Sequence, residues 1–121
     1  PDSFRAKSTK SFYTIMGDAG GIVPKTHVKT NGVVIGKVKS IKLEKNQTRI
    51  DYEIEDYVNI PLGSQVAIKE KGLLGDVYLE IIRAQDEGNY IAAGDEINAL
   101  KGQMNLSKLV DVAGKIGKDI K

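Results

Sequence analysis

The amino-acid sequence predicts an all-β domain, a small barrel or sandwich, followed by an amphipathic C-terminal helix. Two observations predict the β domain: apolar and polar residues alternate in short segments, and turn-forming residues separate these segments at close spacing. Apolar residues that recur at helical spacing near the C-terminus predict the helix. The 121 residues are enough for one domain with its own core.

The alternating pattern places seven strands near residues 10–17, 25–31, 33–43, 48–56, 64–70, 76–83 and 95–99. Asn31 and Gly32 give the strongest hairpin signal, because both tolerate the positive φ of a type I′ turn. Upstream, Gly20 and Gly21 precede Pro24 in a segment that lacks the spacing of a phosphate-binding loop. We interpret that segment as a tight crossing, in which the glycines supply unusual φ values and Pro24 starts the next strand.

The hairpin of the third and fourth strands can be paired residue by residue if Asn46 and Gln47 form its turn. In that register apolar residues pair on one face of the hairpin and charged residues pair on the other. The apolar pattern slips by one residue between Ile41 and Val38, which a β-bulge near Ser40 explains. The predicted pairs are Leu43 with Ile50, Ile41 with Tyr52, Lys42 with Asp51, Glu44 with Arg49, Val38 with Ile54, Lys39 with Glu53 and Lys37 with Glu55. The lysines therefore belong to a self-neutralised sheet face, and we predict no nucleic-acid binding.

Composition argues against several other functions. The formal net charge is only +2, and the absence of cysteine excludes disulfides, thiol catalysis and thiolate metal sites. His27 is the only histidine and is expected to be exposed on a strand, and most carboxylates fall in turns or at strand ends. We therefore predict no enzymatic activity and no metal or cofactor. No uncharged apolar run approaches the roughly 18 residues of a membrane span.

Leu73 and Leu74 stand side by side between Gly72 and Gly75, where two strands should turn. Leucine has none of the backbone properties that favour turn positions. Either the pair caps the end of its own barrel, or it stands out and contacts something apolar.

The predicted helix begins after Asn105, a suitable N-cap. Its apolar face consists of Leu106, Leu109, Val110, Ala113, Ile116 and Ile120. Gly114 and Gly117 weaken it, so it must pack on something. It either folds back on the barrel or packs on copies of itself.

Four spaced motifs occur in order: GGIVP at residues 20–24, VKTNGVVIGKV at 28–38, GLLGDVYLEI at 72–81 and GD at 94–95. Over roughly residues 10–113 they resemble the MCE domain family, and within it the MlaD-type subunits of bacterial phospholipid ABC transport systems. This resemblance implies a seven-stranded β-barrel that assembles as a ring of six around a central channel. It also implies an ABC permease and ATPase as partners, and a location on the periplasmic face of the inner membrane.

The resemblance assigns roles to residues as well. It implies that Leu73 and Leu74 line the channel and contact phospholipid, that Gly72 and Gly75 support their loop, and that the C-terminal helices form a bundle. The residues implied for the bundle are Leu106, Leu109, Val110, Ala113 and Ile116.

We therefore expect three parts: residues 1–9 as a linker from a membrane anchor outside this chain, residues 10–103 as the barrel, and residues 104–121 as the start of the helix. The expected function is that of a lipid-binding, channel-forming subunit that moves phospholipid between inner and outer membranes. The alternative is a structural β-domain that oligomerises or docks partner proteins without transporting lipid. A third possibility, an oligonucleotide-binding barrel, is disfavoured by the balanced charge.

Overall fold

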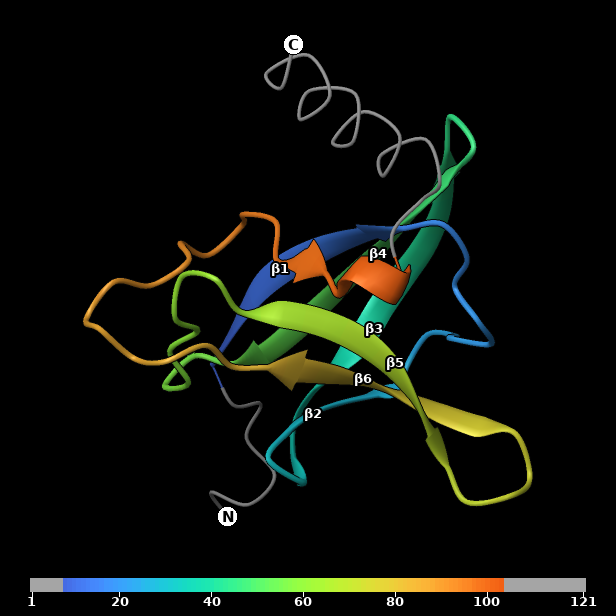
Figure 1. The fold of residues 1–121 in the computed structure, drawn as a ribbon, viewed down its shortest axis with the longest axis horizontal. Helices are drawn as coiled ribbons and strands as arrows, with labels where there is room; N and C mark the ends of the chain where they lie inside the picture. The colour runs from blue at the N-terminus through green and yellow to red at the C-terminus, as the bar shows by residue number, and fades with distance from the viewer. Residues whose placement is uncertain (1–7, 104–121) are drawn as a thin grey trace, which may run out of the picture.

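Seven strands form one continuous sheet in the computed structural model, which describes residues 8–103 (Figure 1). They are β1 (Thr9–Met16), β2 (His27–Thr30), β3 (Val33–Glu44), β4 (Gln47–Glu55), β5 (Gln65–Lys71), β6 (Asp76–Ile82) and β7 (Asn98–Ala99), and a 3-10 helix, η2 (Lys101–Gln103), follows. All seven predicted strands are present. The predicted helix from Asn105 lies outside the described residues, within which no helix is long and apolar enough to span a membrane.

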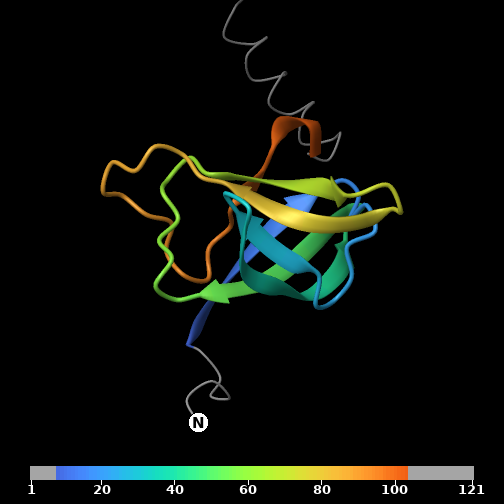
Figure 2. The same ribbon diagram turned by 90° about the horizontal axis from the view of Figure 1, so that it is seen from below.

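The sheet curls until its two edge strands meet, which gives a nearly closed barrel (Figure 2). The strand order is β1-β4-β3-β2-β6-β5-β7, with β2 parallel to β6 and β5 parallel to β7. Across the remaining gap Tyr13 of β1 bridges Glu96, and the Ile97 amide donates a 2.9 Å hydrogen bond to the Tyr13 carbonyl. Of the two predicted architectures, the structure therefore confirms the barrel and excludes the sandwich.

The core fills the barrel with side chains from every strand. Its largest fully buried members are Tyr52, Phe12, Met16, Ile50, Ile54, Ile60, Leu79, Ile81, Ile97, Val28, Val38 and Val66. Tyr52 brings a hydroxyl into this core, 2.7 Å from Thr14 Oγ1, which itself donates to the Ile97 carbonyl at 2.8 Å. Since Thr14 has only one hydroxyl proton, Tyr52 is the donor to Thr14. Burial raises the pKa of the Tyr52 phenol well above its ordinary value. The interior is thus occupied by the protein's own side chains.

The β3–β4 hairpin confirms the predicted bulge but corrects the register. The pairing shifts between Val38 and Ser40, as predicted. The turn, however, consists of Lys45 and Asn46, whose φ values are 47° and 67°, so the turn begins one residue earlier than predicted. The observed pairs are Glu44 with Gln47, Leu43 with Thr48, Lys42 with Arg49, Ile41 with Ile50, Ser40 with Asp51, Val38 with Tyr52 and Lys37 with Glu53. The predicted pair of Lys39 with Glu53 is absent because Lys39 is the bulged residue, and the other six predicted pairs are displaced by two residues. A displacement of two leaves each side chain on its predicted face, because sheet faces repeat every two residues.

The crossing before β2 has the predicted glycine conformations, with φ of 56° at Gly20 and 90° at Gly21. Pro24 does not start the strand. Lys25 has a φ of 75°, and the Thr26 amide donates to the Val23 carbonyl at 3.1 Å, so a turn occupies these residues and β2 begins at His27. The Asn31–Gly32 turn, with both φ values positive, is as predicted.

Candidate functional site

The loop between β5 and β6 is a four-residue turn at one end of the barrel. Lys71 and Asp76 are the last paired residues, and Gly72 and Gly75 have φ values of 76° and 87°. A Cβ atom at either glycine would meet no other atom within 4 Å. The glycines are therefore required by the left-handed backbone conformation and not by lack of space.

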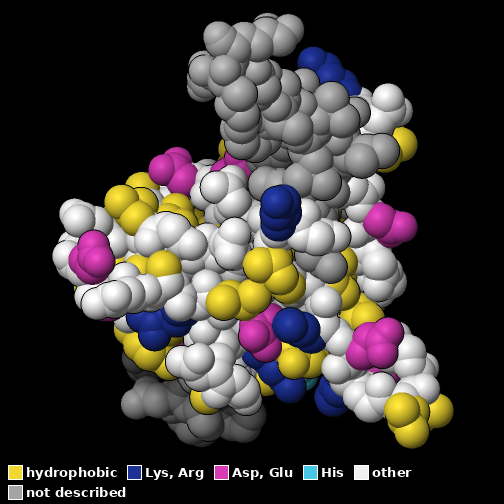
Figure 3. Space-filling model, in the orientation of Figure 1, with side chains coloured by type: hydrophobic (Ala, Val, Ile, Leu, Met, Phe, Trp, Pro, Cys, Tyr) yellow, Lys and Arg dark blue, Asp and Glu magenta, His cyan; other side chains and the backbone are white. Residues whose placement is uncertain are grey.

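Leu73 and Leu74 occupy the tip of this loop and are fully exposed, at 102% and 92% of their reference areas. The loop projects beyond the sheet at the lower right of Figure 1, and apolar side chains mark the same end of the molecule in Figure 3. The interpretation that the two leucines cap their own barrel is wrong. Whether they line a channel stays a prediction.

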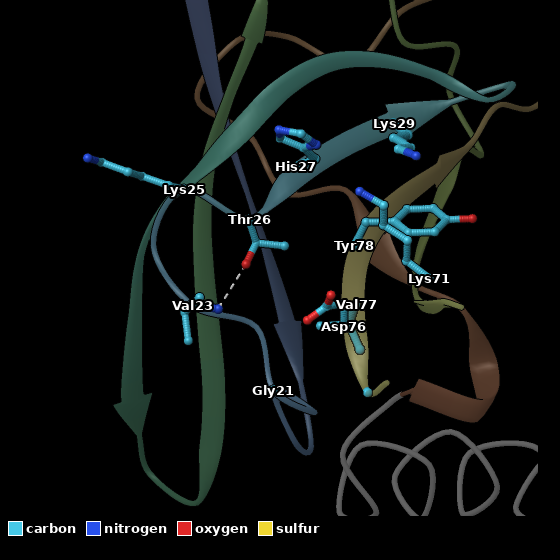
Figure 4. Close-up of a pocket in the computed structure, with 11 residues that line it drawn as sticks. Gly21, Val23, Lys25, Thr26, His27, Lys29, Lys71, Asp76, Val77 and Tyr78 are labelled. Carbon is cyan, nitrogen blue, oxygen red and sulfur yellow. Dashed lines mark hydrogen bonds between the residues drawn. The ribbon is translucent and has the colours of Figure 1, made fainter. Parts of the chain in front are cut away.

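Next to this loop the surface forms a hollow of about 270 Å³, which we call the basic hollow (Figure 4). The residues that matter here are Lys25, His27 and Lys29 from the β2 region, and Lys71, Asp76 and Tyr78 from the β5–β6 hairpin. The Lys29 ammonium lies 4.6 Å from the centroid of the Tyr78 ring, a cation–π contact. Sequence reasoning missed this cluster, because only the parallel pairing of β2 with β6 brings its members together.

We predicted an acidic cross-strand neighbour for Lys37, Lys39 and Lys42 of β3, and the structure confirms one only for Lys37. Lys37 faces Glu53, but Lys42 faces Arg49 because of the two-residue displacement. Lys39 is the bulged residue, and its Nζ donates to Ser11 Oγ at 3.3 Å.

His27 is exposed on its strand, as predicted. Among residues 8–103 there is no group of three or more His, Asp or Glu side chains that could hold a metal ion.

The residues predicted for a helix bundle, Leu106, Leu109, Val110, Ala113 and Ile116, lie outside the described residues. Their role therefore stays a prediction.

The fold and the loop together define a class of domain: a small, nearly closed β-barrel filled by its own side chains, with an apolar loop exposed at one end. The profile of the family described as "MlaD protein" matches residues 8–84 of this sequence. The chain belongs to the MlaD protein family.

Three relatives share the name "Intermembrane phospholipid transport system binding protein MlaD", two from Escherichia coli strains and one from Haemophilus influenzae. The protein of Escherichia coli strain K12 is 32% identical over 115 residues, which cover 89% of this chain and 63% of that protein. The protein of Haemophilus influenzae strain Rd is 32% identical over 110 residues, which cover 84% of this chain and 65% of that protein. The chain thus spans somewhat less than two thirds of the length of these relatives, which are named as binding proteins of a transport system.

Among solved structures, a chain of the Acinetobacter MlaFEDB complex in an ATP-bound conformation superposes with a TM-score of 0.72. The alignment covers 88% of this chain and 82% of that chain, at 18% sequence identity. This likeness shows that the two chains share a fold.

Proposed function

We propose that this chain is the lipid-contacting part of a phospholipid transport subunit, and that Leu73 and Leu74 are its apolar contact. The observation that carries the proposal is the complete exposure of both leucines, on a loop flanked by two glycines in the left-handed backbone conformation. Burying a leucine side chain contributes about 1.5–3 kcal/mol, so an exposed pair has a substantial gain available from an apolar partner. The names of the relatives supply the chemistry of that partner, a phospholipid.

In this proposal the protein is not an enzyme and acts by providing a surface. Six copies, joined as a ring, bring their loops together around a central channel, so that the leucines form a dry annulus that accommodates acyl chains and rejects ions. An ABC permease and ATPase deliver or remove the lipid, and an anchor in the inner membrane holds the ring on the periplasmic face. The ATP-bound state of the Acinetobacter complex supports partners of this kind.

The alternative, a structural β-domain that oligomerises without carrying lipid, makes a different prediction about the purified assembly. Native mass spectrometry of the lipid-transporting form should detect phospholipid bound to the oligomer. An oligomer free of lipid after purification from membranes would favour the structural alternative.

The proposal is tested by placing a photoreactive amino acid at position 73 of the full-length protein in cells. Position 43 is the matched control, because Leu43 is also a leucine on a projecting hairpin and is 82% exposed. We expect lipid crosslinks at position 73 and few at position 43. Equal labelling at both positions would mean that exposure alone, and not a lipid path, determines the contact.

A further inference from the structure

The basic hollow begins where the apolar loop ends. Gly75 and Asp76, which line the hollow, directly follow Leu74 along the chain. Tyr78 lines the hollow four residues after Leu74, so at no more than about 3.4 Å per residue the two lie at most roughly 14 Å apart. An apolar tip and a basic hollow therefore lie within the length of one small amphiphilic molecule.

The fold gathers the charges from separate parts of the sequence. On β2 and β6 the buried Val28 and Leu79 face the core as register partners, so that Lys29 and Tyr78, their neighbours, face outward. Lys71 ends β5 opposite Asp76. In Figure 4 Lys29 and Lys71 lie next to the Tyr78 ring, whereas the Lys25 side chain extends away from them.

The electrostatics of the hollow favour an anion. Lys25, Lys29 and Lys71 line it, and Asp76 is the only carboxylate among its lining residues. Within residues 8–103 the structure gives none of these three lysines an ion pair. Figure 3 shows dark blue and magenta side chains together between the sheet and the apolar tip. The Lys29 ammonium contacts the Tyr78 ring, whose hydroxyl donates a 3.5 Å hydrogen bond to Glu80, the register partner of Lys29. The three lysines still outnumber the carboxylates beside the hollow, Asp76 and Glu80.

We infer that the basic hollow binds the phosphate of a phospholipid headgroup while the acyl chains of the same lipid contact Leu73 and Leu74, an assignment that rests on the proposed function. Lysine recognises phosphate as a point charge with three donors, and the hollow supplies two such groups, Lys29 and Lys71, on one side of the loop. The site would orient each lipid with its headgroup on the barrel and its chains toward the loop tip. Headgroup charge would then affect binding even though the transport path is apolar.

The test uses amide NMR titrations of the 121-residue chain with three soluble probes: dihexanoylphosphatidylglycerol, inorganic phosphate, and dihexanoylglycerol, which has the same chains without phosphate. We expect the phosphatidylglycerol to shift amides of residues 27–29 and 75–78 together with those of Leu73 and Leu74. K29E/K71E should weaken this binding roughly tenfold or more, since bonds to charged groups are lost and repulsion is added. K42E/K45E, the same charge change on the β3–β4 hairpin, should leave it unchanged.

Three results would overturn the inference. If dihexanoylglycerol binds as tightly as the phosphatidylglycerol and K29E/K71E has no effect, the headgroup assignment is wrong but the apolar contact stands. If inorganic phosphate binds the hollow as tightly as the lipid, the hollow is a site for free anions. If neither lipid shifts the amides of Leu73 and Leu74, the proposed function fails together with the inference.

Discussion

At the scale of single residues, Gly36 is the position where the barrel tolerates no side chain. A Cβ there would lie 2.8 Å from the Ile54 Cα and closer still to the Glu53 carbonyl oxygen, because β3 and β4 approach tightly. Both obstacles are backbone and cannot rotate away. We expect Gly36→Ala to lower the free energy of unfolding by about 3 kcal/mol or more, measured by urea titration.

Gly32→Ala is the control for Gly36→Ala. Gly32 has a φ of 80° but open space around its Cβ position, so only backbone strain opposes the change. That strain costs about 1–2 kcal/mol. Equal losses at the two positions would show that the close approach of β3 and β4 is not what requires glycine at position 36.

Tyr52 gives a residue-scale prediction with a defined pH dependence. Its phenol is neutral in the folded core and has a raised pKa, so between its ordinary value of 10.0 and the folded value only the unfolded chain loses the proton. Stability should therefore fall as the pH rises above about 10. Tyr52→Phe should cost about 1 kcal/mol at neutral pH through the lost bond to Thr14, while Thr14 keeps its bond to Ile97.

The same variant should also show a shallower loss of stability above about pH 10. Chemical denaturation of both proteins from neutral to alkaline pH measures the difference directly. An identical pH dependence in the variant would mean that Tyr52 is not the group that couples folding to alkaline pH.

At the scale of elements, the sequence predicted every strand but not the register of the β3–β4 hairpin. Asn46 does lie in the turn, yet asparagine can occupy either central position of a type I′ turn, and lysine gave no signal at position 45. A displacement of two residues keeps every side chain on its face, so the apolar pattern cannot detect it. The bulge near Ser40 was detectable because a bulge changes the phase by one.

The observed turn predicts which substitutions improve the hairpin. Lys45 and Asn46 both have positive φ, so Lys45→Asn together with Asn46→Gly should relieve strain and raise stability by about 1 kcal/mol. Gln47→Gly favours a turn at 46–47, but it puts glycine into β4 and should lower stability. Thermal melts of both variants distinguish a turn at residues 45–46 from a turn at residues 46–47. A Gln47→Gly protein more stable than the unchanged protein would contradict the turn at Lys45 and Asn46.

At the scale of the whole molecule, the resemblance of spaced motifs identified the family and the barrel, while the basic hollow could not be found from sequence. Lys29 and Lys71 are 42 positions apart in the numbering (71 − 29) and meet only because β2 pairs in parallel with β6. No local pattern encodes that pairing. The exposed leucines, by contrast, were conspicuous because leucine is out of place in a turn.

Assembly is the whole-molecule property that the C-terminal segment should control. Replacing Leu106, Leu109 and Val110 with polar residues should weaken the oligomer while the barrel stays folded, since each buried aliphatic side chain contributes about 1.5–3 kcal/mol in every symmetric copy. Light scattering measures the mass, and circular dichroism the barrel. Cooperative unfolding of the barrel would instead place these residues in its core.

The central claim is that Leu73 and Leu74 contact lipid and do not hold the barrel together. The most direct measurement combines a denaturant titration of Leu73→Asn/Leu74→Asn with a lipid transport assay in cells that depend on the full-length protein, and Leu43→Asn is the matched control. We predict that stability changes by less than about 0.5 kcal/mol, as for other exposed positions, while transport is lost only in the double variant. A double variant that loses several kcal/mol, or one that folds normally and still moves lipid, would contradict the account.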